Sequence, residues 1–257
     1  AVVRILTPGT AEQGKGLARI LRRAKEQAQA YPSAGSRENL QLVARGEVLF
    51  GYAQNDIAAL ARAGKGDFQG SAMPRLRALC SLYPEALQIV TLAKAKLATL
   101  QDLAGKRIDI GPEGSGMRIN ARALLAAAQL PPERFAAVRG RGLPGALDDL
   151  RDGKVDAVFL TSAFPNEGVL RLAATHPVEI IAIPAQLRET LRQTQPHLVP
   201  QRIPARTYRG MTAARETVGV TALLVARDDA PAKKVETLLR HLFANVATLS
   251  RGSLQAY

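Results

Sequence analysis

Strand-like and helix-like segments alternate along most of the chain, and this alternation constrains the fold more than any other feature. Runs rich in aliphatic residues occur at residues 2–7, 47–54, 87–93 and 107–112. Amphipathic runs with helical spacing lie between several of them. Strands that alternate with helices are typical of α/β proteins with largely parallel sheets. The sequence therefore predicts an α/β fold with mixed, largely parallel sheets.

Two stretches about a hundred residues apart share one plan, which is too long a period for a solenoid repeat. In residues 40–56 and 147–164 a helix ends at a glycine, and a strand then runs into a polar loop. This similarity predicts two lobes, the first from residues 1–92 and 205–257 and the second from residues 93–204. Strands crossing near Val90 and Val218 are expected to form a hinge along which the lobes close.

Local signals also predict where two helices begin. Ser36 is a candidate N-cap for the helix that Gly46 ends, and Asp228 or Asp229 is a candidate cap for the helix that follows Pro231.

Composition argues against several classes of function. The net charge of +13 is spread evenly along the 257 residues, whereas nucleic-acid binders usually concentrate basic residues on one stripe or arm. A diffuse positive field suits a small anion, although an arginine-rich surface is the plainer alternative. No apolar stretch approaches the ~18 residues of a membrane span, so membrane insertion is not expected. No metal or cofactor motif is present in the sequence.

The most informative motif is the glycine-rich turn at residues 111–116, between an apolar run and an amphipathic one. The glycine order is not that of a dinucleotide fingerprint, and the Lys-Ser/Thr of a P-loop is missing. A helix that begins here would present bare N–H groups, the positive end of its dipole and the Ser115 hydroxyl. We expect these groups to bind a carboxylate or another small anion. The alternative is a plain strand-to-helix turn.

Polar loops follow other predicted strands as well. Gly9 and Thr10 follow the first strand, residues 54–56 end the next, and residues 162–166 end another. Because ligands bind beyond the carboxyl ends of strands in open parallel sheets, these loops together predict a cleft.

Catalysis has little support in the sequence. The three histidines are isolated, and no GxSxG or HExxH motif occurs. The single cysteine, Cys80, lies in an apolar stretch and is expected to pack, although an enzyme that uses this thiol in the cleft is a further hypothesis.

Charged residues near one predicted helix have two interpretations. Arg139 and Arg141 lie where a strand should end and a helix begin, so Arg141 is a candidate partner for an anionic ligand; otherwise both are exposed. The acidic residues Asp148, Asp149 and Asp152 are expected to form a solvated helix face.

Several segments, in this order, resemble the TAXI family of solute receptors of TRAP transporters: GSRENLQLVARGE, RLRALCSLYPEALQIV, LAGKRIDIGPEGSG and LRDGKVDAVFLTSAFP. LVPQRIPARTY and TVGVTALLVAR match its later part, so the resemblance covers nearly the whole chain.

The resemblance implies a periplasmic protein of the type II periplasmic-binding-protein fold, which captures a small carboxylate or amino acid between two lobes. It also implies delivery to an integral membrane TRAP permease, with no enzymatic activity and no cofactor. A ligand-sensing domain of the same fold that feeds a signalling protein is the alternative. By position, the ligand-facing residues would be Gly9, Thr10, Ser36, Asn39, Gln54, Ser115, Gly116, Met117, Ser162 and Phe164.

The chain departs from the family pattern at three places. The first loop has Thr10 and Ala11 where two adjacent aromatics are common, Met117 replaces a threonine, and Phe164 enters a small-residue stretch. Two rings and a hydroxyl are lost and one ring is gained. The expected ligand is therefore larger, more apolar or absent.

Overall fold

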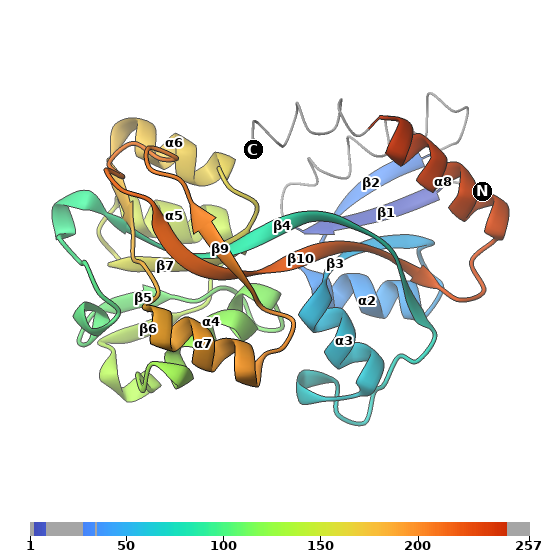
Figure 1. Ribbon diagram of the computed structural model, residues 1–257, viewed down its shortest axis with the longest axis horizontal. Coiled ribbons are helices and arrows are strands. Elements are labelled where there is room, and N and C mark those ends of the chain that lie inside the picture. Colours follow the sequence, from blue (N-terminus) through green and yellow to red (C-terminus); the bar gives the residue numbers. More distant parts are fainter. Residues whose placement is uncertain (1–2, 9–27, 34, 246–257) are drawn as a thin grey trace. The chain divides into compact units, whose positions relative to one another are not determined.

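The computed structural model describes residues 3–8, 28–33 and 35–245, which form two compact units. Unit 1 comprises residues 1–82 and 222–257, and unit 2 comprises residues 83–221. The strands β4 (Leu76–Leu92) and β10 (Arg215–Arg227) carry the chain from one unit into the other (Figure 1).

Unit 1 contains a sheet in the order β2-β1-β3-β10. Its strands are β1 (Val3–Pro8), β2 (Ala28–Ser33) and β3 (Phe50–Gln54), joined by the end of β10. β1 pairs in parallel with β2 and β3, and β10 pairs antiparallel with β3. Its helices are α2 (Ser36–Ala44), α3 (Asn55–Ala63) and α8 (Ala232–Ala244). β3 is buried along its whole length, as its apolar sequence predicts.

Unit 2 contains strands in the order β10-β4-β7-β5-β6, with β8 beside β4 and β9 beside β10. The bounds are β5 (Arg107–Asp109), β6 (Ala137–Arg139), β7 (Ala157–Ser162), β8 (Val178–Ile180) and β9 (Val199–Ile203). The helices are α4 (Gly116–Ala127), α5 (Leu143–Arg151), α6 (Glu167–Thr175) and α7 (Ala185–Thr194). Short 3₁₀ turns occupy residues 93–95, 101–103 and 132–134 of unit 2, and another occupies residues 66–68 of unit 1.

Two apolar clusters cover the two faces of the unit 2 sheet. Phe159 of β7 belongs to one cluster with α4 and α7, and its neighbours Val158 and Leu160 belong to the other with α5 and α6 (Figure 1). This division follows from the strand geometry, in which successive side chains point to opposite faces. Because both faces are covered, β7 reads as a continuous apolar run in the sequence.

The pairing partners confirm the predicted α/β fold with a mixed sheet. β5 pairs in parallel with β6 and β7, whereas β4 pairs antiparallel with β7 and β8. Among the described strands, parallel pairing joins β1 with β2 and β3, and β5 with β6 and β7, whereas the crossing strands supply antiparallel pairs.

The crossing points lie elsewhere than the sequence suggested. The chain passes between units at residues 82/83 and 221/222 rather than near 92/93 and 204/205. Val90 pairs with Val158 and Ile180, and Val218 pairs with Pro200, so both expected hinge residues lie inside the unit 2 sheet. The first half of β4 is partly exposed, and Arg77 and Ser81 interrupt its apolar residues, so it gave no clear strand pattern.

The two predicted helix caps also differ from the structure. Gly35, not Ser36, is the N-cap of α2, and Pro231 is the N-cap of α8. Asp228 instead forms ion pairs with Arg75 and Arg77, at 2.8 and 3.1 Å. Asp229 also pairs with an arginine, Arg75, at 2.9 Å. Because both carboxylates have cationic partners, neither caps α8.

Candidate functional site

The glycine-rich loop joins β5 to α4 and is organised around Asp109. This carboxylate is fully buried, and its Oδ1 accepts a hydrogen bond of 2.9 Å from the Gly111 amide. Its Oδ2 accepts one of 3.0 Å from the Arg141 amide. Gly111 and Gly114 have φ angles of 87° and 72°, a left-handed conformation that favours glycine. The Asp109 carboxylate therefore holds the loop through backbone amides, and the loop connects the end of β5 to the start of α4.

Ser115 is the N-cap of α4, and its hydroxyl is fully engaged there. Its Oγ accepts from the Arg118 amide at 3.2 Å and donates to the Pro112 carbonyl at 2.7 Å. The hydroxyl proton is thus committed within the loop, which changes the expected role of Ser115 from ligand donor to helix cap. The first amides of the helix, at Gly116 and Met117, have no acceptor inside the helix. These two N–H groups remain as donors for an anion, at the positive end of the helix dipole.

Two buried polar side chains near this helix start have no hydrogen-bond partner among the described residues. They are Asn120, at its Nδ2, and Thr161, at its Oγ1; the residues are 4% and 7% exposed. Asn120 lies in the second turn of α4, and Thr161 is next to the last residue of β7, the strand against which α4 packs. Buried donors are nearly always hydrogen-bonded, so a group that satisfies these two is expected.

Sequence reasoning missed both side chains. The signal was present in part, because Asn120 adjoins Ala121 on the apolar face of α4 with Leu124. A polar residue on such a face has no packing explanation. Thr161 gave no comparable signal, since threonine is common in strands.

The loop after β7 is occupied by a polar network. Ser162 Oγ accepts from Gln88 Nε2 at 3.2 Å and from Asn166 Nδ2 at 3.3 Å, and donates to the Ala163 carbonyl at 3.0 Å. Phe164 is buried in the same apolar cluster as α5 and α6. The structure thus gives both expected ligand residues, Ser162 and Phe164, neighbours inside unit 2.

Arg141 is paired with a buried carboxylate. Its Nη1 lies 3.0 Å from both oxygens of Asp149, and Arg139 Nη1 lies 3.2 Å from Asp149 Oδ2. The Asp149 side chain is only 2% exposed, so the expectation that it forms a solvated face is wrong, although Asp148 is exposed as expected. The hydrogen bond from Arg141 holds the pKa of Asp149 below its usual range, against the opposing effect of burial.

This pairing predicts a specific acid sensitivity. Because the folded-state pKa of Asp149 is lowered, its contribution to stability is present above the ordinary carboxyl pKa, about 4, and is lost as pH falls through the lowered value. We expect Asp149→Asn to be less stable at pH 7 and to lose less stability between pH 5 and pH 2 than the wild type. Urea denaturation across this range measures both curves. Parallel curves would show that the ion pair contributes nothing to the pH dependence.

In unit 1, three expected ligand residues lie together where β3 ends and α2 begins. Ser36 Oγ accepts from the Gln54 amide at 3.0 Å, and Asn39 Nδ2 donates to the Tyr52 carbonyl at 2.8 Å. Ser36, Asn39 and Gln54 are all buried. Gly9 and Thr10, the other expected ligand residues of this lobe, lie outside the described residues.

Cys80 lies half-buried on β4 in unit 1. Burial raises the pKa of its thiol, which favours the protonated form over the nucleophilic thiolate. This environment argues against the hypothesis that Cys80 is a catalytic nucleophile.

The described residues contain no group of three histidine, cysteine or acidic side chains placed to hold a metal ion. None of the described helices combines the length and hydrophobicity that a membrane span requires.

Comparisons with known proteins give both a family and a fold. The family model described as NMT1-like family matches residues 12–255. The GluR0 ligand-binding core from Nostoc punctiforme, solved with L-glutamate, has a TM-score of 0.58 and 15% identity, and the match covers 99% of each chain.

Two further solved structures share the architecture. The effector binding domain of a BenM variant has a TM-score of 0.59 and 12% identity, covering 97% of this chain and 94% of that one. The periplasmic aliphatic sulphonate binding protein SsuA from Escherichia coli has a TM-score of 0.58 and 15% identity, covering 97% and 74%. At such identities the likeness concerns the fold, and it confirms the predicted periplasmic-binding-protein type of α/β fold.

Proposed function

Because the chain belongs to the NMT1-like family, we propose that it is an extracytoplasmic solute receptor that binds a small anionic solute. The fold is shared with structures solved as binding proteins or binding domains, SsuA and GluR0 among them. The ligands named for those two, a sulphonate and L-glutamate, each carry an acid group, which supports an anion as the ligand here. Binding without chemical turnover is the activity we assign.

One observation carries this proposal: donors without acceptors lie in the first two turns of α4 and on β7, the strand that α4 contacts. The amides of Gly116 and Met117 have no acceptor inside the helix, and Ser115 caps the next one. Asn120 Nδ2 and Thr161 Oγ1 are buried nearby with unused hydrogen-bonding capacity. An anionic group at the helix terminus would satisfy the amides, and a polar group beside it would satisfy the side chains.

We assign the delivery step to a TRAP permease, and the protein to the TAXI type, from the sequence resemblance. The periplasm is the corresponding compartment. This assignment is tested by adding the protein to proteoliposomes that contain the TRAP permease subunits encoded in the same genome and measuring solute uptake. Uptake of the bound solute that depends on this protein supports it, and uptake through an ATP-driven permease instead would contradict it.

The ligand itself can be found by two linked measurements. Native mass spectrometry of the purified protein identifies a molecule that co-purifies. Calorimetric titration with amino acids, oxo-acids and alkanesulfonates, each compared with its uncharged ester or amide, then tests the requirement for an anion. Acids that bind at least tenfold more tightly than their uncharged analogues support the proposal. Equal affinities would contradict it.

Thr161 provides a matched test of stability against binding. Thr161→Val keeps the shape of the side chain and removes a buried hydroxyl that has no partner, so the unliganded protein is expected to gain about 1 kcal/mol of unfolding free energy. The same change is expected to weaken solute binding about fivefold, because the ligand loses a hydrogen bond. Thermal denaturation and calorimetry measure the two effects. A variant that is both less stable and unchanged in affinity would show that the hydroxyl is satisfied without a ligand.

A sensing role is the second candidate, favoured by the likeness to an effector binding domain. In that case the same solute would change the activity of a regulatory partner rather than be taken up. A deletion strain that loses solute-dependent gene expression but keeps solute uptake would favour sensing over transport.

A further inference from the structure

A pocket in unit 2 lies beside α4, and the donors assigned to the solute do not line it. It has a volume of about 660 Å³ and lies within unit 2, between α4 and residues 130–138. Along α4 it is lined at positions 118, 122, 125 and 126, which recur with helical spacing on one face, and Gln129 lines it just after the helix ends. The residues that line it do not include Gly116, Met117, Asn120 or Thr161. The pocket is therefore separate from the donors assigned to the solute.

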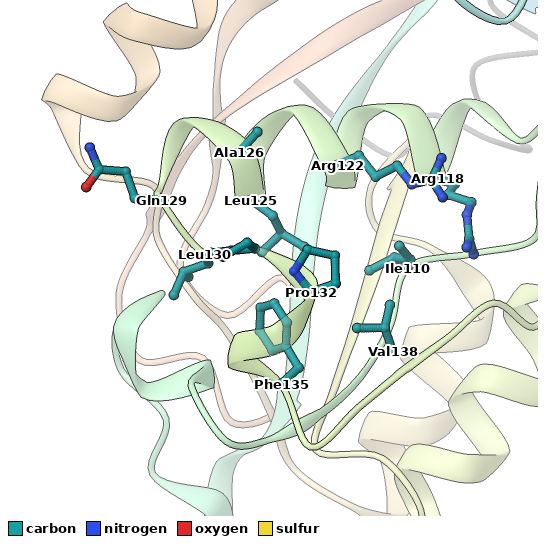
Figure 2. A pocket seen from close by; sticks show the side chains of 11 residues that line it. Ile110, Arg118, Arg122, Leu125, Ala126, Gln129, Leu130, Pro132, Phe135 and Val138 are labelled. Atoms are coloured by element: carbon teal, nitrogen blue, oxygen red, sulfur yellow. The ribbon is translucent and has the colours of Figure 1, made fainter.

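The floor of this pocket is apolar. Leu130, Pro132 and Phe135 lie side by side in its middle, with Ile110 and Val138 next to them (Figure 2). Val138 belongs to β6, the last strand in the sheet order, and is 37% exposed, so its side chain is accessible to a ligand in the pocket. A floor of this kind would contact the hydrocarbon body of a ligand, and the volume is within the range of small-molecule sites.

One end of the pocket carries excess positive charge. Arg118 and Arg122 lie together at this end, and Gln129 lies at the other (Figure 2). Both arginines share one carboxylate, since Arg118 Nε lies 2.9 Å and Arg122 Nη1 lies 3.7 Å from Glu113 oxygens. The Arg118 Nε–H is buried and makes no aligned hydrogen bond, and the Arg122 side chain is 57% exposed. Two guanidinium groups against one carboxylate leave a net positive charge.

We propose that this pocket binds a second small molecule, an amphiphilic anion whose hydrocarbon body lies on the apolar floor. Its carboxylate or sulfonate would pair with Arg122, which is held only loosely by Glu113. Arg118 is less available, because its Nη1 donates to the Gly111 carbonyl at 2.9 Å. That bond also connects the pocket to the glycine-rich loop, so occupation is expected to alter the loop at the start of α4.

The probe for this site is 2-naphthoate, with 2-naphthamide as its uncharged control. The chain contains no tryptophan, so naphthalene fluorescence can be followed directly. We expect 2-naphthoate to bind at least fivefold more tightly than 2-naphthamide and to shift the Val138 methyl resonances. Val138→Asp is expected to weaken binding more than tenfold, and Arg122→Gln at least fivefold. Glu113→Gln is expected to strengthen binding about threefold, because it removes the competing carboxylate.

The matched control is Arg171→Gln, which removes an exposed arginine from the Arg171–Glu167 pair on α6. It lowers the net charge as Arg122→Gln does, so it is expected to leave the affinity for 2-naphthoate unchanged. Equal losses in both arginine variants would show only an effect of overall charge and overturn the proposal. Absence of binding, or binding that leaves Val138 unshifted and survives Val138→Asp, would overturn it as well.

Discussion

The variant Gly116→Pro is expected to bind the solute ten- to a hundredfold more weakly than the variant Gly116→Ala. Both substitutions add a Cβ atom to Gly116, but only proline lacks the amide proton. A hydrogen bond to a charged group contributes about 1.5–3 kcal/mol, which sets the expected ratio. Calorimetric titration with the tightest binder from the panel of acids gives the two dissociation constants.

The structure allows this comparison because position 116 is the first residue of α4. Proline is favoured at the first helical position, where its missing N–H has no intrahelical partner. Ser115 has φ and ψ of −82° and 148°, the extended conformation that a following proline requires. Circular dichroism and thermal denaturation of the two variants establish that both remain folded. Equal affinities in two folded variants would exclude the Gly116 amide as a ligand donor.

Removal of the Asp109 carboxylate is expected to have the largest effect on stability. Asp109→Ala leaves the amides of Gly111 and Arg141 without their acceptor in a buried site, at an expected loss of about 2–4 kcal/mol of unfolding free energy. Urea denaturation measures this loss. Amide hydrogen exchange should also accelerate in residues 111–115, because Asp109 holds the loop.

Asp109→Asn is the conservative comparison. It keeps one oxygen acceptor and replaces the other with an NH₂ group. Its free energy of unfolding is therefore expected to lie between those of the wild type and the alanine variant. If Asp109→Ala lost less than about 0.5 kcal/mol, the loop would not depend on this carboxylate, and the start of α4 would have to be fixed by other contacts.

The fold followed from local sequence signals where burial was uniform. β3 and β7 are buried almost throughout, and their apolar runs predicted them. The first half of β4 was missed because Arg77 and Ser81 interrupt its apolar residues and its exposed and half-buried positions follow no strict alternation. The helix at residue 116 was expected from the glycine-rich turn, and Ser115 does cap it.

The site could be predicted only as far as its backbone. The turn at residues 111–116 indicated free amides, but the sequence does not show that the Pro112 carbonyl accepts a hydrogen bond from the Ser115 hydroxyl. The buried Asp149 pairs with arginines on β6 and the loop after it, which the acidic run within α5 does not show, so that run suggested exposure instead. Asn120 and Thr161 became candidates only once α4 was seen to pack against β7.

The most direct measurement of the central assignment is the amide resonance of Gly116 and of Met117 during titration. We predict that ¹H–¹⁵N spectra recorded with the tightest-binding acid show both amide protons moving downfield to saturation. The dissociation constant from these shifts should match the calorimetric value. If the acid saturates the protein while both amides keep their positions, the anion lies elsewhere and the start of α4 is only a turn.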